Sequence, residues 1–469
     1  MIDRTRLRAL ASSGPVHFMG VGGAGMCALA ELLVRDGVTV TGCDVKQGPG
    51  VVDLEALGAT VHIGHDPAHV EGSAALIVTS AVPAEHPELA RARELDVPVF
   101  KRAEALGAWV EVGKVVGVAG THGKTTTTAM TTEVLAAAGL EPTGLVGGRV
   151  AGWGGNLRRG GDQLFVVEAD EYDRSFLTLR PDVAIVTNLE ADHLDIYGDL
   201  EGVRDGFRRF LRGVKPGGRV IVCADDHGAS KLLPEFADAG YTYGTVAGAM
   251  LRATDIEMGE GLTRCTVVEE GRSQGTLELS LPGTHNLLNA LAAAATARHL
   301  GVDWAHVKRA LAAFVGVGRR FDVLGDASGV TVIDDYAHHP TEIRATLAGV
   351  RAAYEGRRLV VAFQPHLYSR TRDFAAAFGS ALAAADVVWV TDIFPAREAP
   401  IEGITGALVA EHTRDAGAAD VRYHETLDTL AGAIVETLED GDVLVAMGAG
   451  SIEVVAPDAF ARLREVTHA

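Results

Sequence analysis

The chain has few cysteines and no long apolar run, and both shortages limit what kind of protein it can be. None of its four cysteines, Cys27, Cys43, Cys223 and Cys265, shows C-x-x-C spacing, so they indicate reduced core residues. No apolar stretch approaches the roughly 18 residues of a membrane span. The first residues carry Asp and Arg where a signal peptide would have its apolar core. We therefore expect a soluble, cytoplasmic protein.

Positive charge is also scarce. The chain has 42 Lys and Arg against 62 Asp and Glu, which gives a formal net charge of −20. A surface that binds nucleic acid or an anionic membrane needs clustered Lys and Arg, so both partners are disfavoured. Small anionic ligands are still allowed where local cations meet. With 469 residues, 47% of them hydrophobic and 22% charged, the chain is an ordinary globular protein of two to four domains.

The most informative motif lies at residues 115–128. A β-branched apolar run over 115–119 predicts a buried strand, and a helical stretch follows the segment Gly120–Thr126. The spacing is G-x-x-G-K-T-T, because Val118 stands where the longer phosphate-loop pattern has its first glycine. Glycines let backbone N–H groups converge on a phosphate, while Lys124 can reach the terminal phosphates and Thr125 can hold magnesium. Set against a chance Gly-Lys-Thr in a surface turn, this context predicts a nucleoside triphosphate site.

A second glycine-rich turn lies near the N-terminus. Residues 16–19 predict a strand, residues 20–26 satisfy G-x-G-x-x-G, and residues 38–43 predict the next strand. Asp44 follows Gly25 by 19 positions, which completes a dinucleotide-binding fingerprint. NAD, FAD or a nucleotide sugar would satisfy this chemistry equally, and a merely tight turn is the plainer alternative. Two further strands are predicted at 76–79 and 97–100.

Polar clusters follow two predicted strands of the central region. The strand at 164–168 runs into four carboxylates, which are costly at the end of a buried strand unless they meet cations or a metal. Glu168 and Asp170 are therefore candidate magnesium ligands. The strand at 183–187 leads to His193, which lies between two aspartates and could be a second metal ligand. A solvated acidic turn and a structural histidine are the alternatives.

The remainder of the chain predicts a third unit. Residues 240–280 alternate short apolar runs with charges, as in antiparallel strands, and residues 282–289 open a long alanine-rich helix. A linker at 315–322 carries two adjacent arginines, and strands then alternate with helices. Polar clusters follow four of these strands, at 334–340, 364–370, 395–398 and 448–451. Turn chemistry or helix capping explains each cluster singly, but together they indicate a site.

The predicted fold class is α/β with three domains. Residues 1–111 form an N-terminal Rossmann-like domain, and residues 112–318 form a central P-loop ATP-binding α/β domain with a small antiparallel sheet. Residues 319–469 form a C-terminal Rossmann-like domain. A pyrophosphate site, an ATP site and scattered cations suggest two anionic ligands joined at a domain interface.

Taken together, the motifs resemble the Mur ligases of peptidoglycan synthesis over nearly the whole chain. The matching segments are 20–26, 120–128, 168–171, Asn188 with 192–193, 282–289, 319–321, 334–340, 364–370 and 395–398. The strings Asp-Asp-Tyr-Ala-His-His-Pro and Pro-Ala-Arg-Glu point to the alanine-adding branch. The resemblance implies an ATP- and magnesium-dependent, ADP-forming ligase that joins L-alanine to UDP-N-acetylmuramate through an acyl phosphate. A monomer or weak homodimer is expected, with the C-terminal domain closing over ATP.

The resemblance also implies roles for individual residues. The residues expected in catalysis are Lys124, Glu168, His193, His338 and Arg370, with magnesium held by Thr125, Glu168 and His193. The expected ATP contacts are Gly120, Thr121, His122, Gly123, Lys124, Thr125, Thr126, Asn289, Arg320 and Asp335. The expected substrate contacts are Gly22, Gly23, Gly25, Asp44, Ser80, Tyr336, His338, His366 and Arg370.

Three features depart from the family pattern. Leu367 stands where relatives often carry arginine, which leaves Arg370 with more of the phosphate contact, and Tyr172 replaces a commoner serine. Sister ligases carry a carbamylated lysine after the second metal ligand. This chain offers arginines there instead, at 204, 208 and 209, so we predict no carbamate.

Three rival interpretations remain open on the sequence alone. An NAD-dependent oxidoreductase would use the N-terminal fingerprint but would leave Gly120–Thr126 without a role. A related ligase that recycles whole murein peptides onto the same UDP-sugar shares most of these motifs. A non-catalytic ATP-binding regulator is disfavoured by the candidate metal ligands.

Overall fold

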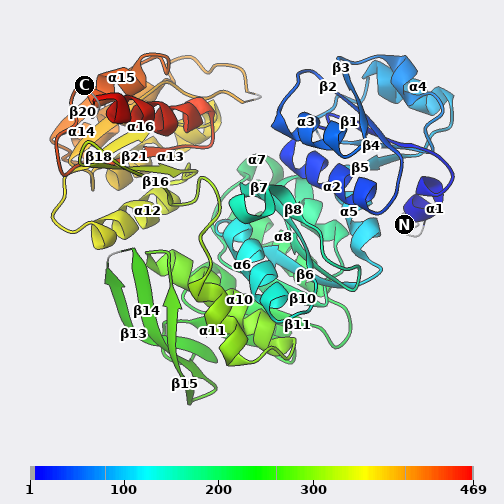
Figure 1. Cartoon of the computed structure of the whole chain (residues 1–469), viewed down its shortest axis with the longest axis horizontal. Coiled ribbons are helices and arrows are strands. Elements are labelled where there is room, and N and C mark those ends of the chain that lie inside the picture. The colour runs from blue at the N-terminus through cyan, green and yellow to red at the C-terminus, as the bar shows by residue number, and fades with distance from the viewer. Residues whose placement is uncertain (1–5, 80, 260, 397, 467–469) are drawn as a thin grey trace. The chain divides into compact units, whose positions relative to one another are not determined.

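The computed structural model describes residues 6–79, 81–259, 261–396 and 398–466 (Figure 1). The chain forms two compact units. The first comprises Met1–Asp255, Cys265–Leu277 and Leu288–Phe314. The second comprises Ile256–Arg264, Glu278–Leu287 and Val315–Ala469. Three sheets run through the described residues, one near each end of the chain and a larger one between them in sequence.

The N-terminal sheet has the strand order β3-β2-β1-β4-β5, and every pairing in it is parallel. Its strands are β1 (Val16–Met19), β2 (Val40–Asp44), β3 (Thr60–Ile63), β4 (Ala75–Val78) and β5 (Val99–Lys101). The helices of this region are α1 (Arg6–Ala11), α2 (Ala24–Arg35), α3 (Pro49–Ala56), η1 (Pro67–Val70), α4 (Pro87–Glu94) and α5 (Arg102–Val110). β1 and β4 are buried throughout, as central parallel strands are. The glycine-rich turn after β1 therefore lies where the strand order reverses, which is where open α/β sheets bind ligands.

The central sheet has ten strands in the order β15-β14-β13-β12-β11-β10-β6-β9-β7-β8. They are β6 (Lys114–Ala119), β7 (Thr143–Val150), β8 (Gly155–Arg158), β9 (Leu164–Glu168), β10 (Val183–Val186), β11 (Arg219–Cys223), β12 (Gly240–Gly244), β13 (Leu251–Gly259), β14 (Leu262–Glu269) and β15 (Arg272–Leu279). β6 lies between β9 and β10, parallel to both. Because the carboxyl ends of parallel strands meet at one edge, the segments that follow these three strands are brought together.

Helices connect the strands of the central sheet. They are α6 (Lys124–Ala137), η2 (Ala151–Trp153), η3 (Tyr172–Thr178), α7 (Leu194–Tyr197), α8 (Leu200–Arg212), α9 (His227–Ser230), η4 (Leu233–Phe236), α10 (Thr284–His299) and α11 (Trp304–Ala312). The predicted alanine-rich helix is α10, and its alanines from Ala290 to Ala297 are almost completely buried. Small side chains let this helix approach its neighbours closely, so its composition reflects packing.

The C-terminal sheet has the order β16-β17-β21-β18-β19-β20, in which only the β16–β17 pair is antiparallel. Its strands are β16 (Asp322–Ala327), β17 (Val330–Asp335), β18 (Leu359–Phe363), β19 (Val387–Val390), β20 (Asp420–Tyr423) and β21 (Val443–Met447). Its helices are α12 (Pro340–Ala353), α13 (Tyr368–Leu382), α14 (Gly406–Asp415), α15 (Leu430–Val435), η5 (Ser451–Val454) and α16 (Val455–Val466). The parallel arrangement places the polar segments after β17, β18, β19 and β21 along one edge of this sheet.

The strands predicted from apolar runs are confirmed to within two residues at each end. The expectation of antiparallel strands over 240–280 is wrong for β12, which is parallel to both β11 and β13. Helix α13 begins inside the predicted polar segment 364–370, at Tyr368. The reason is a cap from outside the helix, since the Glu398 carboxylate accepts hydrogen bonds from the Ser369 amide at 2.9 Å and the Ser369 hydroxyl at 2.5 Å. This satisfies first-turn donors that the local sequence leaves open. The proposed domain boundaries at 111 and 318 stay predictions.

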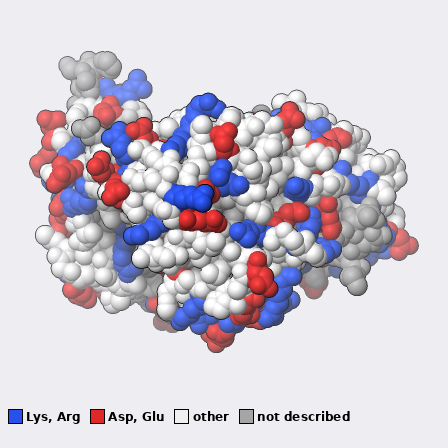
Figure 2. All heavy atoms as spheres, turned by 90° about the horizontal axis from the view of Figure 1, so that it is seen from below, with Lys and Arg blue, Asp and Glu red and all other residues white. Residues whose placement is uncertain are grey.

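The surface carries both signs of charge. Figure 2 shows Lys and Arg side chains on one face in small groups interspersed with Asp and Glu, without a single basic field. Among the described residues, no helix is both long and apolar enough to cross a membrane.

Candidate active site

The phosphate loop joins β6 to α6. Gly120 and Gly123 have φ angles of +144° and +78°, in the region that L side chains rarely adopt. A Cβ atom on Gly123 would also lie only 2.5 Å from Oδ1 of Asn289. The sequence needs glycine at both positions, because the turn must bring backbone N–H groups to the start of α6 without side chains in the way.

The segment after β10 holds this loop in place. The amide of His122 donates to Oδ1 of Asn188 at 2.7 Å, and Nδ2 of Asn188 donates back to the His122 carbonyl at 3.1 Å. The Thr187 hydroxyl donates to the same carbonyl at 2.6 Å. The Thr121 hydroxyl accepts from the Glu190 amide at 2.9 Å. Thr187 and Glu190 carry no signal in the sequence alone, and Asn188 was predicted only as part of a motif.

The Lys124 ammonium is held inside the loop. Its Nζ donates to the carbonyls of Gly120 and Thr121 at 2.7 and 3.2 Å and to the Glu171 carboxylate at 2.9 Å. Burial by itself lowers the pKa of Lys124, but Glu171 and Asp170 outweigh it, so the pKa is raised and the group stays charged. Burial raises the pKa of Glu171 to about 7 against the opposing effect of Lys124. Glu171 was quoted within a motif but was not predicted as a site residue.

His193 lies beside this ion pair. Its Nε2 is 3.9 Å from Oε1 of Glu171 and 3.9 Å from Oδ2 of Asp192, and the Tyr172 ring packs against it edge-on. The residue has a left-handed backbone with φ of 53° and precedes α7. Such strain in a non-glycine residue usually accompanies a functional constraint. The structure thus places the expected second metal ligand beside carboxylates and the phosphate-loop lysine.

Glu168 and Asp170 leave β9 on the other side of the loop. The Glu168 carboxylate accepts from the amide of Gly147 at 2.7 Å, and the Asp170 carboxylate accepts from the amide of Tyr172 at 3.1 Å. Each therefore has one fixed hydrogen bond and retains oxygen lone pairs for a further ligand. Oxygen donors of this kind are what magnesium prefers.

Three threonines and an asparagine complete the start of α6. Thr125 and Thr126 are buried in its first turn, and the Thr127 hydroxyl donates to Oδ1 of Asn289 at 3.1 Å. Asn289 is buried on α10 and thus packs against the first turn of α6. Its predicted place near the phosphate loop agrees with this geometry.

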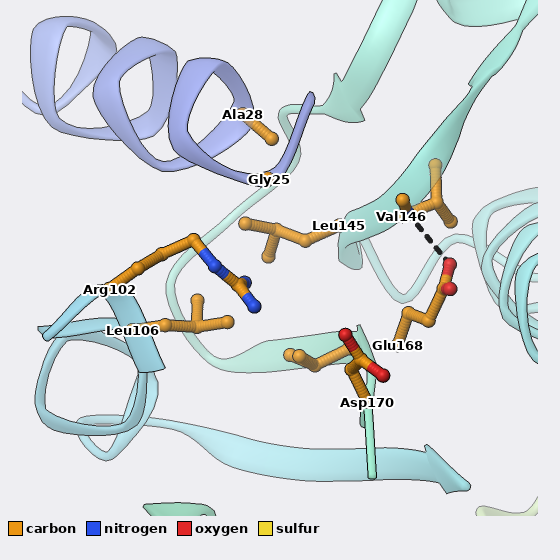
Figure 3. Close-up of a pocket in the computed structure, with 10 residues that line it drawn as sticks. Gly25, Ala28, Arg102, Leu106, Leu145, Val146, Glu168 and Asp170 are labelled. Carbon is orange, nitrogen blue, oxygen red and sulfur yellow. Dashed lines mark hydrogen bonds between the residues drawn. The ribbon is translucent and has the colours of Figure 1, made fainter. Parts of the chain in front are cut away.

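A cavity of about 250 Å³ opens between the N-terminal glycine turn and the acids after β9 (Figure 3). It is lined by Gly25, Ala28, Arg102, Leu106, Leu145, Val146, Gly147, Val167, Glu168 and Asp170. The Arg102 side chain points into it from the first residue of α5, and Glu168 and Asp170 lie across from it. A Cβ on Gly25 would lie 3.0 Å from the Arg102 guanidinium, so the glycine turn and Arg102 line the same part of the cavity. Arg102 was not predicted from the sequence, although a cation that begins a helix directly after a strand can indicate an anion contact.

The N-terminal turn has its own internal anchor. The amide of Gly22 donates to Oδ2 of Asp44 at 2.8 Å, across the ends of β1 and β2. Gly23 is the N-cap of α2, so the backbone N–H groups that follow it are at the helix N-terminus. Gly22, Gly23, Gly25 and Asp44 are thus gathered at one end of the sheet, as predicted. Ser80 lies outside the described residues.

The second unit holds another cluster around Tyr336. The guanidinium groups of Arg319 and Arg320 lie 5.2 and 4.7 Å from the Tyr336 ring centroid. Asp335 is buried and accepts from the amides of Phe321 and Ala337 at 2.7 and 2.8 Å. Because these bonds use both carboxylate oxygens, Asp335 fixes the linker that carries Arg320.

Histidines continue this cluster along the sheet edge. Nδ1 of His338 contacts the Tyr336 carbonyl at 3.0 Å, and the His338 ring lies 5.9 Å from that of His366. Arg370 is buried in the first turn of α13, just after Leu367, whose φ is 68°. The predicted residues Arg320, Asp335, Tyr336, His338, His366 and Arg370 thus all belong to one unit, at segments that follow β17 and β18.

The first unit has the parts of a phosphoryl-transfer site. It combines a glycine loop, a charged lysine, hydroxyl and carboxylate oxygens for a hard metal ion, and an arginine-lined cavity beside a second glycine turn. Such an arrangement can bind a nucleoside triphosphate and keep a second anionic ligand next to it.

Comparison with known proteins agrees with this class. Three family models match successive segments: the Mur ligase family catalytic domain at residues 15–112, the Mur ligase middle domain at 118–297, and the Mur ligase glutamate ligase domain at 319–450. The chain belongs to the Mur ligase family, whose members are ATP-dependent, ADP-forming ligases. The resemblance and the three-domain α/β fold class are therefore confirmed.

Individual relatives indicate which members of the family the chain is similar to. The chain is 43% identical over 443 residues to UDP-N-acetylmuramate–L-alanine ligase of Burkholderia pseudomallei (strain 668), covering 93% of this chain and 95% of that protein. Identity to the Burkholderia multivorans ligase of the same name is 44% with the same coverage. The crystal structure of UDP-N-acetylmuramate-alanine ligase from Thermotoga maritima superimposes with a TM-score of 0.83 at 31% identity, over 97% of this chain and 100% of that one. A murein peptide ligase from Psychrobacter arcticus gives 0.69 at 25%, over 96% and 99%.

Proposed function

We propose that the chain ligates L-alanine to the lactyl carboxylate of UDP-N-acetylmuramate, with ATP converted to ADP and phosphate. The observation that carries this proposal is the phosphate loop with its Lys124–Glu171 pair in the same compact unit as the Arg102 cavity. One ligand of that unit is a nucleoside triphosphate, and the cavity leads to a second glycine turn suited to a pyrophosphate.

The reaction needs activation of an inert acid. A carboxylate is a poor electrophile, so an amine does not form an amide from it directly at neutral pH. Phosphorylation of the lactyl carboxylate by ATP gives an acyl phosphate, and the L-alanine amine attacks its carbonyl carbon. The tetrahedral intermediate then expels phosphate. The first step brings two anions together, and the second develops an oxyanion and expels phosphate, so catalysis is mainly alignment and charge neutralisation.

The residues around the loop fit ATP and magnesium. Lys124 is charged and buried, and we assign it to the transferring phosphoryl group, once Glu171 releases it. The Thr125 hydroxyl and Glu168 carboxylate would hold one magnesium ion, and His193 a second. Bound magnesium supplies positive charge beside the phosphates and the carboxylate. The backbone of 120–126 and Asn289 would shape the ATP site.

The N-terminal turn is assigned to the UDP part of the substrate. The free backbone N–H groups after Gly23 suit a pyrophosphate, and Asp44 suits a ribose hydroxyl. We add Arg102 to this set, since its guanidinium faces the cavity between the turn and the acids. Ser80 keeps its predicted role as a substrate contact.

The C-terminal unit is assigned to the remaining contacts. Arg320, held by Asp335 through the Phe321 amide, is proposed as an ATP contact. Tyr336, His338, His366 and Arg370 are proposed for the amino acid and the intermediate. Leu367 cannot supply the cation that relatives carry there, which leaves that charge to Arg370.

Two rival functions are weaker. An oxidoreductase is inconsistent with membership of a ligase family and leaves the phosphate loop without a role. Peptide recycling remains the second candidate, but among the solved structures the alanine ligase gives a TM-score of 0.83 against 0.69 for the murein peptide ligase of similar coverage. The cytoplasm, where ATP and UDP-sugars are made, is the proposed location, and a monomer or weak homodimer the proposed state.

The deciding experiment measures phosphate release from ATP, magnesium and UDP-N-acetylmuramate with one amine at a time. We expect L-alanine to be the best substrate, with glycine and L-serine within a modest factor, since one methyl group discriminates by roughly 1–3 kcal/mol. A murein tripeptide should give almost no release. Preference for the tripeptide would establish recycling instead, and release independent of any amine would contradict a ligase.

A further inference from the structure

A second cluster of ionisable side chains lies within the N-terminal sheet, outside the site described above. His17 is on β1, Cys43 on β2, His69 in η1 and Glu88 in the first turn of α4. One nitrogen, sulfur or oxygen atom from each lies within 4.8 Å of the others. His17, Cys43 and Glu88 are completely buried, and the His69 side chain is 17% exposed.

The alternation of side chains along parallel strands explains how these groups meet. Val16 and Phe18 belong to the core on the α2 face of the sheet, whereas Met19 and Cys43 pack on the face covered by η1 and α4. His17 shares that second face with Met19, because residues two apart point the same way. An apolar core is the normal content of such a face, so four polar groups there need an explanation.

Glu88 is the residue of this cluster that most requires a positively charged partner. Its carboxylate accepts from the Asp66 amide at 2.9 Å and lies 3.3 Å from Nδ1 of His69 and 3.3 Å from Sγ of Cys43. Among the described residues, the side chains within ion-pair distance of it are two histidines, His65 at 3.5 Å and His69 at 3.3 Å, which are charged only when protonated, and no Lys or Arg is among them. A buried carboxylate without a fixed positive partner is costly, and a metal ion would supply that partner.

His17 provides an independent sign of a missing ligand. Its Nδ1 is 2.8 Å from the Thr41 hydroxyl, while its Nε2 is buried and has no hydrogen-bond partner. This is the usual environment of a metal-binding imidazole, in which one nitrogen is fixed by a hydrogen bond and the other faces the ion.

We propose that His17, Cys43, His69 and Glu88 form a zinc site in the N-terminal domain. Thiolate and imidazole ligands favour zinc over magnesium or calcium, and four ligands suit its tetrahedral coordination. With zinc–nitrogen and zinc–sulfur bonds of about 2.0 and 2.3 Å, neighbouring ligand atoms in a tetrahedron lie roughly 3.3–3.8 Å apart. Measured to the same oxygen, Oε1 of Glu88, Sγ of Cys43 lies at 3.5 Å and Nδ1 of His69 at 3.3 Å, and both distances fit this range. Binding releases the Cys43 thiol proton to solvent, and His65, 3.3 Å from Sγ, lies beside the site.

The site is linked to the glycine-rich turn through the backbone of Cys43. The Cys43 carbonyl accepts hydrogen bonds from the amides of Gly20 and Val21 at 2.8 and 3.1 Å. An ion that fixes Cys43 would therefore also stiffen the turn after β1. The consequence is structural and does not depend on the ligase reaction.

The test uses the purified full chain, stripped with a chelator and titrated with zinc or cobalt(II) without ATP. We expect one zinc per chain, retained in excess magnesium. Cobalt should give the strong visible bands of a tetrahedral site together with a thiolate-to-cobalt charge-transfer band. Hydrogen exchange at the Gly20 and Val21 amides should slow when zinc is bound.

Substitutions separate this site from unspecific binding. Cys43→Ser should lose the charge-transfer band and weaken zinc binding at least about 10-fold, and His69→Gln, at the least buried position, should weaken it similarly. Cys27→Ser, a buried cysteine on α2, is the matched control and should bind like the unaltered chain. If Cys43→Ser does not fold, His69→Gln alone decides. Substoichiometric zinc, a cobalt spectrum without the thiolate band, or equal binding by His69→Gln would overturn the proposal.

Discussion

Lys124 shows how the surroundings of one residue decide what it can do. Burial alone would favour its neutral form, but the carboxylates of Glu171 and Asp170 keep it charged. Glu171 in turn depends on Lys124, since burial alone raises its pKa. Lys124 and Glu171 therefore depend on each other. Removal of either side chain leaves the other one buried without its charge partner, at the full cost of its desolvation.

This coupling predicts different outcomes for activity and stability. Lys124→Ala should lower kcat about 10²- to 10³-fold and destabilise the first unit by about 2 kcal/mol, because Glu171 is left buried without its partner. Adding Glu171→Gln should recover most of the stability but none of the activity. Single-turnover phosphate release and thermal unfolding measure the two effects.

Lys215→Ala is the matched control, since it removes the ion pair with Asp182 in the same unit, away from the loop. It should leave kcat unchanged. Full activity of Lys124→Ala would contradict the assignment of Lys124 to the phosphoryl group.

Arg102 is the residue whose role rests most on tertiary structure. Arg102→Ala should raise KM for the UDP-sugar at least about 10-fold with kcat changed less than about 3-fold, because the guanidinium contributes binding in ground and transition states alike. The KM of Arg102→Lys should lie between that of the unaltered chain and that of Arg102→Ala, since lysine keeps the charge but not the planar guanidinium. Steady-state kinetics at saturating ATP give both constants. Arg93→Ala, an exposed arginine on α4, should have no effect; a fall in kcat alone for Arg102→Ala would rule out a binding role.

At the scale of elements, the ends of neighbouring parallel strands gather the site. β9, β6 and β10 bring Glu168, the phosphate loop and Asn188 to one edge. β17 and β18, which lie on either side of β21, do the same for the segments of His338 and His366. The connections are held by side chains of other elements, as when Glu398 caps α13. An element therefore begins or ends where a distant partner satisfies its backbone.

Strand β17 carries the buried carboxyl group of Asp334, which should make the stability of this region depend on pH. Burial raises the pKa of Asp334 to about 6, although Arg319 opposes the shift. Because this pKa is higher in the folded state than in the unfolded state, the bound proton stabilises the fold below about pH 4. This stabilisation is lost as the pH rises through about 6. Between pH 4 and 7 this group should reduce the local stability by about 2 kcal/mol.

The measurement is hydrogen exchange of the Val332 and Ile333 amides across this pH range, after correction for intrinsic rates. Asp334→Asn, which cannot ionise, should reduce this pH dependence while keeping a hydrogen-bond acceptor for Arg319, and the contribution of the neighbouring Asp335, whose pKa burial also raises, should persist. Parallel pH profiles for the unaltered chain and Asp334→Asn would show that another group is responsible.

At the scale of the whole molecule, two compact units share the functional residues. The first holds the phosphate loop, its acids and the Arg102 cavity, and the second holds the arginine and histidine cluster around Tyr336. A net charge of −20 does not prevent binding of anions, because a few cations are concentrated at the loops.

Nucleotide binding should accordingly stabilise the first unit. A non-hydrolysable ATP analogue with magnesium, at about 100 times its Kd, should add about 2.7 kcal/mol and slow hydrogen exchange in β6 and α6. Removal of magnesium with a chelator should reduce the effect, and Lys124→Ala should abolish most of it. Lys231→Ala, at an exposed lysine, is the control. Equal stabilisation of the Lys124 variant would mean that the nucleotide binds elsewhere.

The sequence alone determined the α/β class, the strands and the two glycine turns, because buried parallel strands are continuous apolar runs and tight turns need glycine. It also indicated that Glu168 ends a buried strand and that Lys124 and His193 follow buried strands, while their roles as site residues stay predictions. It gave no role to Glu171 or Arg102, whose importance depends on what lies opposite them. It also counted Cys43 as an ordinary core residue.

Only the tertiary structure decided those pairings. Glu171 becomes a partner of Lys124, and Cys43 a neighbour of His17 and Glu88, because parallel strands far apart in sequence run side by side. Local periodicity reports which face of an element is buried, and contains no information on which distant side chain shares that face. The elements are therefore encoded along the chain, and the chemistry arises where the elements meet.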